Sequence, residues 1–276
     1  MIVISKPAEM RDWCKQQQDS IGFVPTMGSL HQGHLSLIRQ AKKENTYVVV
    51  SIYVNPTQFG PNEDFESYPR VPKRDCELIS DLVDVVFLPT DACMYPLGKN
   101  THKLIENKLS NKLCGASREG HFDGVLKIVL KLLQIVTANK LYMGLKDFQQ
   151  QLLVSRMIQE FHLPVTMIAC PTVRESSGLA ISSRNQNLNS EEQQIAPLLY
   201  NTIVSFPELF KKKGSDQTCR ELTSILEKAS FAVDYLQILD QTTLEVAEIL
   251  NENTRIFVAA KLGSTRLIDN YGVDDA

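Results

Sequence analysis

The sequence predicts an α/β protein, a doubly wound parallel sheet followed by a smaller α+β domain. Near-continuous β-branched and aromatic runs are typical of strands that are buried on both faces. These runs occupy residues 47–54, 83–89 and 164–171. Amphipathic helical patterns alternate with them, at residues 35–43, 73–82 and 148–161. This alternation indicates right-handed crossovers in an open parallel sheet.

Three further segments belong to the first domain. The apolar "IGFV" at 21–24 predicts a strand that leads towards the helix at 35–43, and "LYM" at 141–143 predicts another. The stretch 124–140 is apolar nearly all round, apart from a narrow stripe that includes Lys127 and Lys131. A helix with this pattern is either buried in the core or part of a subunit contact.

A boundary is expected in the polar segment "SSRNQNLNSEEQQ". Within it, Ser190 and Gln193 have the spacing of a capping box, which would begin a new helix. Beyond it, amphipathic helices surround two predicted strands at 233–240 and 254–263. We therefore expect one domain over residues 1–185 and a second, α+β domain over 186–276.

Composition restricts the partners. The 276 residues carry a formal net charge of -3, which gives no electrostatic reason to expect nucleic acid or an anionic membrane. The basic run at 211–214 reads as a solvated helix end. No signal-peptide pattern opens the chain, and its six cysteines are scattered without a CxxC pair. We expect a cytoplasmic protein with reduced, mostly buried thiols.

The segment "PTMGSLHQGH", residues 25–34, lies where a strand is followed by a helix. Gly28 and Gly33 allow a ligand to approach the backbone closely, and helix-opening N–H groups favour phosphate. His31 and His34 share one helix face, where imidazoles could stabilise charge in a phosphoryl transition state. Two alternatives stay open, a zinc pair that lacks a visible third ligand and purely structural helix caps.

Two other turns carry side chains that suit an anion. In "GLKDFQQQ", Lys146 opposes the helix dipole unless an anion lies beside it, although a surface salt bridge with Asp147 is equally compatible. In "SGLAISSRNQ", two serine hydroxyls and Arg184 could form a flexible polyphosphate clamp. The GxxxxG spacing at 115–120 is followed by His121 and Phe122, so it is not a P-loop.

Together these segments resemble the pantothenate synthetase (pantoate–β-alanine ligase) family, within the HxGH nucleotidyltransferase superfamily. The resemblance covers essentially the whole chain. The segments that carry it are "VPTMGSLHQGH", "VSIYVNPTQFGPNEDFESYPR", "ASREGHFDGV", "GLKDFQQ", "GLAISSRN" and "GSTRLIDN". It implies a Rossmann-like N-terminal domain, a C-terminal lid domain and a cytoplasmic homodimer. It also implies that ATP and pantoate form pantoyl-adenylate and pyrophosphate with Mg²⁺, after which β-alanine attacks and AMP and pantothenate leave.

The resemblance also implies roles for residues at matching positions, with His34 as the family's catalytic histidine and His31, Lys146 and Arg184 beside it. It implies pantoate and β-alanine binding by Gln58 and Gln150. The ATP site would comprise Met27, Gly28, Ser29, Leu30, His31, Gln32, Gly33, His34, Gly144, Leu145, Lys146, Asp147, Val173, Ile181, Ser182, Ser183 and Arg184. Secondary candidates are Asn55, Tyr68, Arg118 and His121. The metal ligands stay unassigned.

The chain departs from the family pattern at a few positions. Cys114 stands where Glu is common, Glu119 where Pro is common, Leu145 where Glu or Gln is common, and Ile181 where Leu or Met is usual. Two rival functions are considered: an HxGH nucleotidyltransferase with a CDP- or dinucleotide product, and a catalytically silent nucleotide-binding scaffold. The paired glutamines argue against the first, and the intact His31, His34, Lys146 and Arg184 argue against the second.

Overall fold

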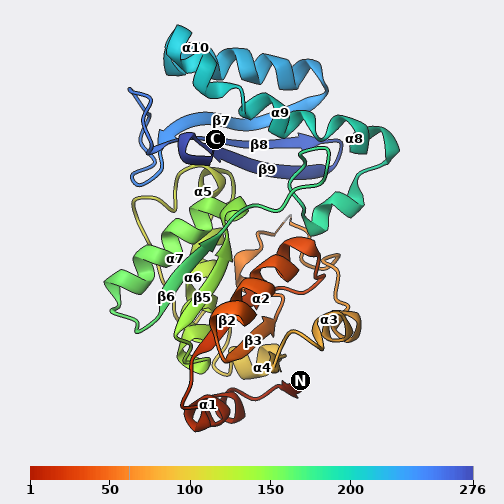
Figure 1. Cartoon of the computed structure of the whole chain (residues 1–276), viewed down its shortest axis with the longest axis vertical. Helices are drawn as coiled ribbons and strands as arrows, with labels where there is room; N and C mark the ends of the chain where they lie inside the picture. The colour runs from red at the N-terminus through yellow and green to blue at the C-terminus, as the bar shows by residue number, and fades with distance from the viewer. Residues whose placement is uncertain (62, 276) are drawn as a thin grey trace. The chain divides into compact units, whose positions relative to one another are not determined.

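The computed structural model describes residues 1–61 and 63–275. The chain divides into two compact units. Unit 1 comprises residues 1–110, 118–145 and 150–171, and unit 2 comprises residues 111–117, 146–149 and 172–276. The trace in Figure 1 shows a mixed α/β unit and a second unit with a small sheet.

Unit 1 is built on a six-stranded sheet with the order β1-β4-β3-β2-β5-β6, and every adjacent pair is parallel. The strands are β1 (Ile2–Ile4), β2 (Ile21–Thr26), β3 (Tyr47–Ile52), β4 (Val85–Phe87), β5 (Lys140–Gly144) and β6 (Thr166–Cys170). The prediction of an open parallel sheet is therefore confirmed.

Helices connect these strands. They are α1 (Pro7–Gln16), α2 (Gln32–Glu44), α3 (Pro72–Ile79), α4 (Asp91–Met94), α6 (His121–Ile135) and α7 (Phe148–Glu160), with the 3₁₀ helices η1 (Pro56–Gln58) and η2 (Leu145–Asp147). Helix α2 packs on β2, β3 and β5 (Figure 1). Among the described residues, none of the helices combines the length and the apolar composition that crossing a membrane requires.

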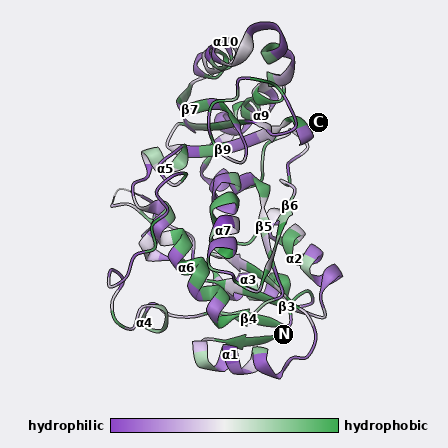
Figure 2. Cartoon of the chain, turned by 90° about the vertical axis from the view of Figure 1, so that its left-hand side faces the viewer, coloured by the Kyte–Doolittle hydropathy of each residue, from purple (hydrophilic) through white to green (hydrophobic). Residues whose placement is uncertain are grey.

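The core of unit 1 follows from the alternation of side chains along the central strands. Val24 of β2 and the pair Val48 and Val50 of β3 pack with Ile38 of α2 in one cluster. Their neighbours in the chain, such as Phe23, are equally buried and point to the opposite face. Strands buried on both faces need helices on both sides of the sheet. In agreement with this, Figure 2 shows that β3, β4 and much of α6 are hydrophobic.

Unit 2 is an antiparallel sheet of order β7-β8-β9, covered by helices. The strands are β7 (Phe231–Asp240), β8 (Thr254–Leu262) and β9 (Thr265–Gly272). The helices are α5 (Cys114–Ser117), α8 (Ser190–Ile195), α9 (Leu198–Ile203) and α10 (Phe206–Lys228), with η3 (Ser183–Asn187) and η4 (Val273–Asp275). Phe206 and Leu222 of α10 and Ile256 of β8 are fully buried in its core.

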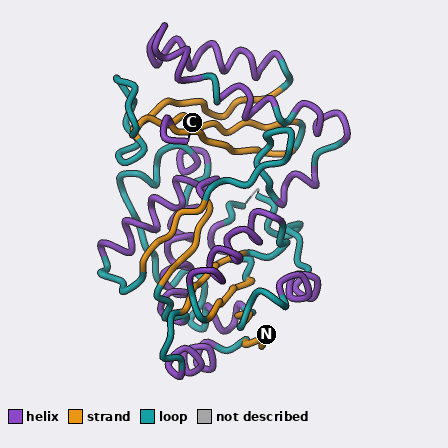
Figure 3. Tube along the Cα trace, in the orientation of Figure 1, coloured by secondary structure: helices purple, strands orange, loops and turns teal. Residues whose placement is uncertain are grey.

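Several details differ from the sequence prediction. The apolar segment 124–140 holds two elements, because α6 ends at Ile135 and β5 begins at Lys140. Its helical part is buried within the chain, which favours the core alternative. A third strand, β9, extends the second sheet, and residues 241–253 between β7 and β8 form a loop (Figure 3). The edge strand β1 and helix α1 were not predicted.

The capping box and the basic run were predicted only in part. The capping box of α8 uses Asn189 and Glu192, one residue earlier than expected, since the Asn189 carboxamide accepts from the Glu192 N–H at 2.9 Å. The basic run 211–213 is exposed and ends at Gly214, whose φ of 75° interrupts α10, as predicted for a solvated helix end. All six cysteines are free, but only Cys14, Cys114 and Cys170 are buried.

Candidate active site

Strand β2 lies at the topological switch point of the sheet. The chain passes from β2 outward through β3 to β4, and then returns to the other side of β2 with β5 and β6. The ladder between β2 and β5 ends at the pair Phe23–Leu141, although β2 continues to Thr26 and β5 to Gly144. Ligands of open α/β sheets bind where two such strands diverge at their carboxyl ends. The predicted turns that begin at Met27 and Gly144 both leave this edge.

The turn after β2 is held by a buried carboxylate. Gly28 and Ser29 have φ values of 83° and 52°, and a Cβ on Gly28 would lie 2.9 Å from an oxygen of Asp75. The Asp75 carboxylate accepts the Ser29 N–H at 2.8 Å and the Leu30 N–H at 2.9 Å. Asp75 is 1% exposed. These two amides therefore hold the turn itself, and phosphate binding by the N–H groups that open helix α2 stays a prediction.

The two histidines cap helix α2 reciprocally. His31 Nδ1 accepts the Gly33 N–H at 3.1 Å, and His34 Nδ1 accepts the His31 N–H at 3.4 Å. The ring centroids are 4.0 Å apart. Because each Nδ1 is an acceptor, the proton of each neutral imidazole lies on Nε2. Both histidines therefore cap the helix through Nδ1, as the structural alternative predicted. Their Nε2–H groups are hydrogen-bond donors.

The alternative that His31 and His34 bind zinc needs a third protein ligand close to them. Over residues 1–61 and 63–275, no group of three or more His, Cys, Asp or Glu side chains is placed to hold a metal ion. His31 and His34 direct their Nδ1 atoms to backbone amides of their own helix. Their arrangement is that of a helix cap with two donors.

A second part of the site is the 3₁₀ helix η1 after β3. Asn55 is 1% exposed, and its Nδ2 donates to Gln58 Oε1 at 3.0 Å and to the Gly124 carbonyl at 3.1 Å. Gln58 Nε2 lies 3.1 Å from Met27 Sδ. The predicted pantoate residue Gln58 is therefore brought next to the turn that follows β2.

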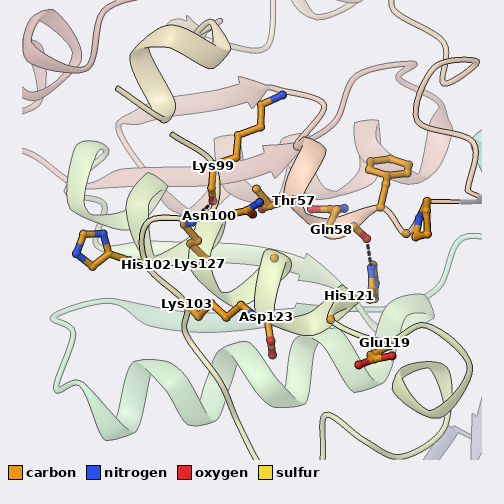
Figure 4. Close-up of a pocket in the computed structure, with 15 residues that line it drawn as sticks. Thr57, Gln58, Lys99, Asn100, His102, Lys103, Glu119, His121, Asp123 and Lys127 are labelled. Atoms are coloured by element: carbon orange, nitrogen blue, oxygen red, sulfur yellow. Dashed lines mark hydrogen bonds between the residues drawn. The ribbon is translucent and has the colours of Figure 1, made fainter. Parts of the chain in front are cut away.

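The start of helix α6 supports η1 from the other side. His121 Nδ1 is 2.8 Å from the Gln58 carbonyl oxygen (Figure 4). Arg118 lies 2.9 Å from His121 Nε2 and makes a bidentate ion pair with Glu63, with N···O distances of 2.7 and 2.6 Å. Burial alone would raise the pKa of Glu63, but its bonds to Arg118 outweigh this and hold that pKa below its ordinary value.

The remaining secondary candidate in unit 1 is Tyr68. Its side chain is 6% exposed, and its ring packs edge-on against Phe59 with centroids 5.9 Å apart.

Three predicted residues lie where β5 ends. Gly144 ends β5, Leu145 begins η2, and Gln150 lies half-buried in the first turn of α7. All three occur at the β5 edge of the switch point.

A cavity of about 230 Å³ lies beside η1 in unit 1 (Figure 4). Its walls are η1 with residues 59–61, the 99–103 loop and the start of α6. The side chain of Lys103 extends towards Asp123. Burial raises the pKa of Asp123, and the Lys103 charge offsets part of that effect. The cavity is therefore lined in part by η1, the 3₁₀ helix that carries Gln58.

In unit 2, Lys146 has only a weak partner in its neighbour. Its Nζ is 3.8 Å from Asp147 Oδ1, which is too long for a hydrogen bond, and the two side chains are 19% and 49% exposed. Such a pair contributes little. Lys146 also acts on the buried Asp269 carboxylate, where its charge offsets part of the rise in pKa that burial causes. The Lys146 backbone is fixed, because its carbonyl accepts from Asn270 at 3.0 Å.

The third predicted turn is ordered by its own hydrogen bonds. The Ile181 N–H donates to the Val173 carbonyl at 3.0 Å, which joins two predicted ATP residues. Ser182 caps η3 by accepting the Arg184 N–H at 3.3 Å, and Ser183 begins that helix. The segment therefore forms a capped 3₁₀ turn, and its role as a polyphosphate clamp stays a prediction.

Sequence reasoning missed the anchor of this turn. Arg174 makes a bidentate pair with Asp269, at 2.7 and 2.9 Å, and its guanidinium lies 3.7 Å from the centre of the Tyr200 ring. Arg174 also donates to the Gly178 carbonyl at 3.2 Å. Asp269 belongs to the matched segment "GSTRLIDN", which was the available signal.

The departure at Cys114 is accommodated within unit 2. Cys114 Sγ lies 3.0 Å from the Tyr235 hydroxyl and 3.8 Å from an Arg266 nitrogen. Arg266 donates to the Asp234 carboxylate at 2.7 Å. Asp234 therefore supplies the counter-charge for Arg266.

Comparisons with known proteins agree on one family. A family model described as pantoate-beta-alanine ligase matches residues 2–272. A pantothenate synthetase of Pseudothermotoga lettingae is 45% identical, over 98% of each chain. The crystal structure of pantothenate synthetase from Thermus thermophilus has a TM-score of 0.92 and 40% identity, over 99% of each chain. A Francisella tularensis pantoate-beta-alanine ligase, complexed with beta-gamma ATP and beta-alanine, has a TM-score of 0.85 and 39% identity, covering 100% of this chain and 99% of that one.

Proposed function

The chain belongs to the pantoate–β-alanine ligase family, and on that premise we propose how its own residues carry out the family's reaction. The enzyme condenses pantoate with β-alanine in an ATP-dependent reaction that passes through pantoyl-adenylate. A carboxylate is a poor acyl donor, and adenylation provides it with a leaving group. AMP, pyrophosphate and pantothenate are the products.

In the first step a pantoate carboxylate oxygen attacks the α-phosphorus of ATP, and the bond to the β-phosphate oxygen breaks. His31 and His34 donate their Nε2–H groups to phosphate oxygens as negative charge develops there. Lys146 and Arg184 add positive charge for the departing pyrophosphate. Donors that are already oriented in the resting enzyme stabilise a transition state without reorganisation. The mutual Nδ1 capping of the histidines provides this orientation.

The rest of the ATP site follows the three ordered turns. Met27 to His34 line the ATP site, Gly144 to Asp147 and Ile181 to Arg184 complete it around the phosphates, and Val173 lies near the adenine. The hydrogen bond that joins Ile181 to Val173 supports placing these two residues in one site. Leu145 contributes its backbone at a position where the family often has a polar side chain.

Gln58 and Gln150 hold pantoate through its hydroxyl groups and carboxylate. In the second step the amine of β-alanine attacks the acyl carbonyl carbon, the bond to AMP breaks, and the amine loses a proton. Positioning of the two reactants accounts for most of the rate, because a mixed anhydride is already activated. Neither step requires a covalent intermediate with a side chain.

The described residues contain no group of His, Cys, Asp and Glu that fits a protein-bound metal. Mg²⁺ would enter with ATP and would neutralise phosphate charge, and its protein ligands stay unassigned. A cytoplasmic homodimer, in which residues 186–276 act as a lid on an ATP- and pantoate-binding domain of residues 1–185, completes the proposal.

The observation that carries this proposal is the His31–His34 cap at the switch point of the sheet, in a chain of this family. The test is product analysis by mass spectrometry after parallel incubations with pantoate, β-alanine, Mg²⁺ and either ATP or CTP. Pantothenate and AMP in equal amounts are expected. Consumption of CTP in place of ATP, or ATP binding without any pyrophosphate release, would overturn it.

A further inference from the structure

The buried network around η1 leads to one residue that none of the ATP or pantoate motifs contains. We propose that Tyr95 is a positioning residue for pantoate: through Asn55 it fixes the carboxamide of Gln58, so that Gln58 meets the substrate as a hydrogen-bond donor. This inference rests on the proposed role of Gln58 in binding pantoate.

Two backbone groups identify which amide atom of Asn55 is the oxygen and which is the nitrogen, because each of them can act in only one way. Its Oδ1 accepts the Thr57 N–H at 3.4 Å, and its Nδ2 donates to the Gly124 carbonyl at 3.1 Å. A flipped amide would place NH₂ against N–H and oxygen against oxygen. Asn55 Nδ2 therefore has one remaining N–H, and it reaches Gln58 Oε1 at 3.0 Å.

The Gln58 amide is oriented in turn. Because Oε1 accepts from Asn55, Nε2 is directed the other way, where Met27 Sδ lies 3.1 Å from it. A thioether sulfur is a weak acceptor, and it can face only one of the two N–H groups. Gln58 is thus set to donate to a substrate oxygen, which a carboxylate or hydroxyl group provides.

Tyr95 completes the network from outside η1. Its hydroxyl donates to Asn55 Oδ1 at 2.5 Å and lies 3.1 Å from Thr57 Oγ1. The phenol is 7% exposed, and burial raises its pKa above the ordinary value. Lys131 Nζ lies 4.4 Å from the centre of the ring and donates to the Met94 carbonyl. The ring therefore has little freedom to move away from Asn55.

Tyr53 provides a matched control. It is also 7% exposed and also donates its hydroxyl to a side-chain oxygen, in this case the Asp91 carboxylate at 2.8 Å. Its hydroxyl thus serves Asp91 and not the amide pair of Asn55 and Gln58. The variants Tyr95→Phe and Tyr53→Phe therefore remove one hydroxyl each from equally buried rings.

The experiment measures KM for pantoate and for ATP in pantoate-dependent ATP–pyrophosphate exchange, together with the melting temperature. For Tyr95→Phe we expect KM for pantoate to rise by up to roughly tenfold, the limit set by complete loss of the hydrogen bond from Gln58 to pantoate, with KM for ATP unchanged. Tyr53→Phe should leave both unchanged. An unchanged KM for pantoate in Tyr95→Phe, or equal increases in both variants, would overturn the proposal.

A double-mutant cycle separates positioning through Asn55 from a general structural effect. Asn55→Asp keeps an acceptor for Tyr95 but loses the donor to Gln58, so KM for pantoate should rise. Adding Tyr95→Phe should then raise it little further, whereas additive effects would refute the pathway. If Tyr95→Phe does not fold, an unchanged KM in Asn55→Asp decides against the proposal. Absence of pantoate-dependent exchange in the wild type would instead refute the proposed function.

Discussion

The buried Asp75 carboxylate holds the turn between β2 and α2, so its removal should destabilise that turn. Any effect on substrate binding should follow from this loss of structure. In Asp75→Ala, the Ser29 and Leu30 N–H groups lose their acceptors at 2.8 and 2.9 Å. Both residues are 6% exposed, so water does not easily replace the carboxylate. An unsatisfied buried amide costs about 1–3 kcal/mol, and a hydrogen bond to a charged group is at the upper end. Two such bonds predict a loss of about 3–5 kcal/mol.

The loss is measured by urea denaturation, with Glu77→Ala as control because Glu77 is exposed on the same helix, α3. We expect KM for ATP to rise in Asp75→Ala, because Gly28 and Ser29 keep their left-handed conformations through this carboxylate. A destabilisation no larger than that of Glu77→Ala, with KM for ATP unchanged, would refute the role assigned to Asp75.

Three further predictions concern the catalytic pair, the contact below η1 and the ion pair at Glu63. His34→Ala should lower the rate of pyrophosphate exchange by roughly 10²-fold, on the scale of one transition-state donor; near-normal exchange would exclude that role. Gly124→Ala should raise KM for pantoate, because its Cβ would lie 2.2 Å from the Thr57 carbonyl oxygen. Its control is Gly60→Ala, which meets only Glu63 atoms at 3.7 Å or more, and equal KM values in the two variants would contradict the reasoning. The pKa of Glu63 is lowered on folding from its ordinary 4.5, so its stabilising effect is present above about pH 4.5 and is lost as pH falls through the folded value. The difference in unfolding free energy between wild type and Glu63→Gln should therefore shrink below about pH 4.5, and a difference independent of pH would be contrary evidence.

The sheet could be predicted because its strands are unusually regular in composition. Residues 47–54 and 83–89 carry apolar runs and contain β3 and β4, which are buried along nearly their whole length. The run at 164–171 also contains a strand of the sheet, but β6 lies at its edge and is mostly exposed or half-buried. The helix at 148–161 was equally clear from its period. The switch point itself follows only from strand order, which no local pattern contains.

The supporting residues of the site could not be found in the same way. Asp75 acts on a turn 45 and 46 residues earlier in the chain, and in the sequence it is one of many acidic residues in helical first turns. Tyr95 follows a four-residue helix and reaches Asn55 across 40 residues. Such partners meet only in the folded chain. Because nothing in the sequence around them distinguishes them, they could not be predicted. The motif residues, by contrast, stand out through an unusual local combination, two histidines beside two glycines.

The most direct test of the account is pantoate-dependent ATP–pyrophosphate exchange by the whole chain, with Mg²⁺ present and β-alanine left out. We expect exchange that requires pantoate, because the acyl-adenylate forms reversibly before the amine is needed. Exchange without pantoate, or ATP binding with no exchange when pantoate is added, would contradict it.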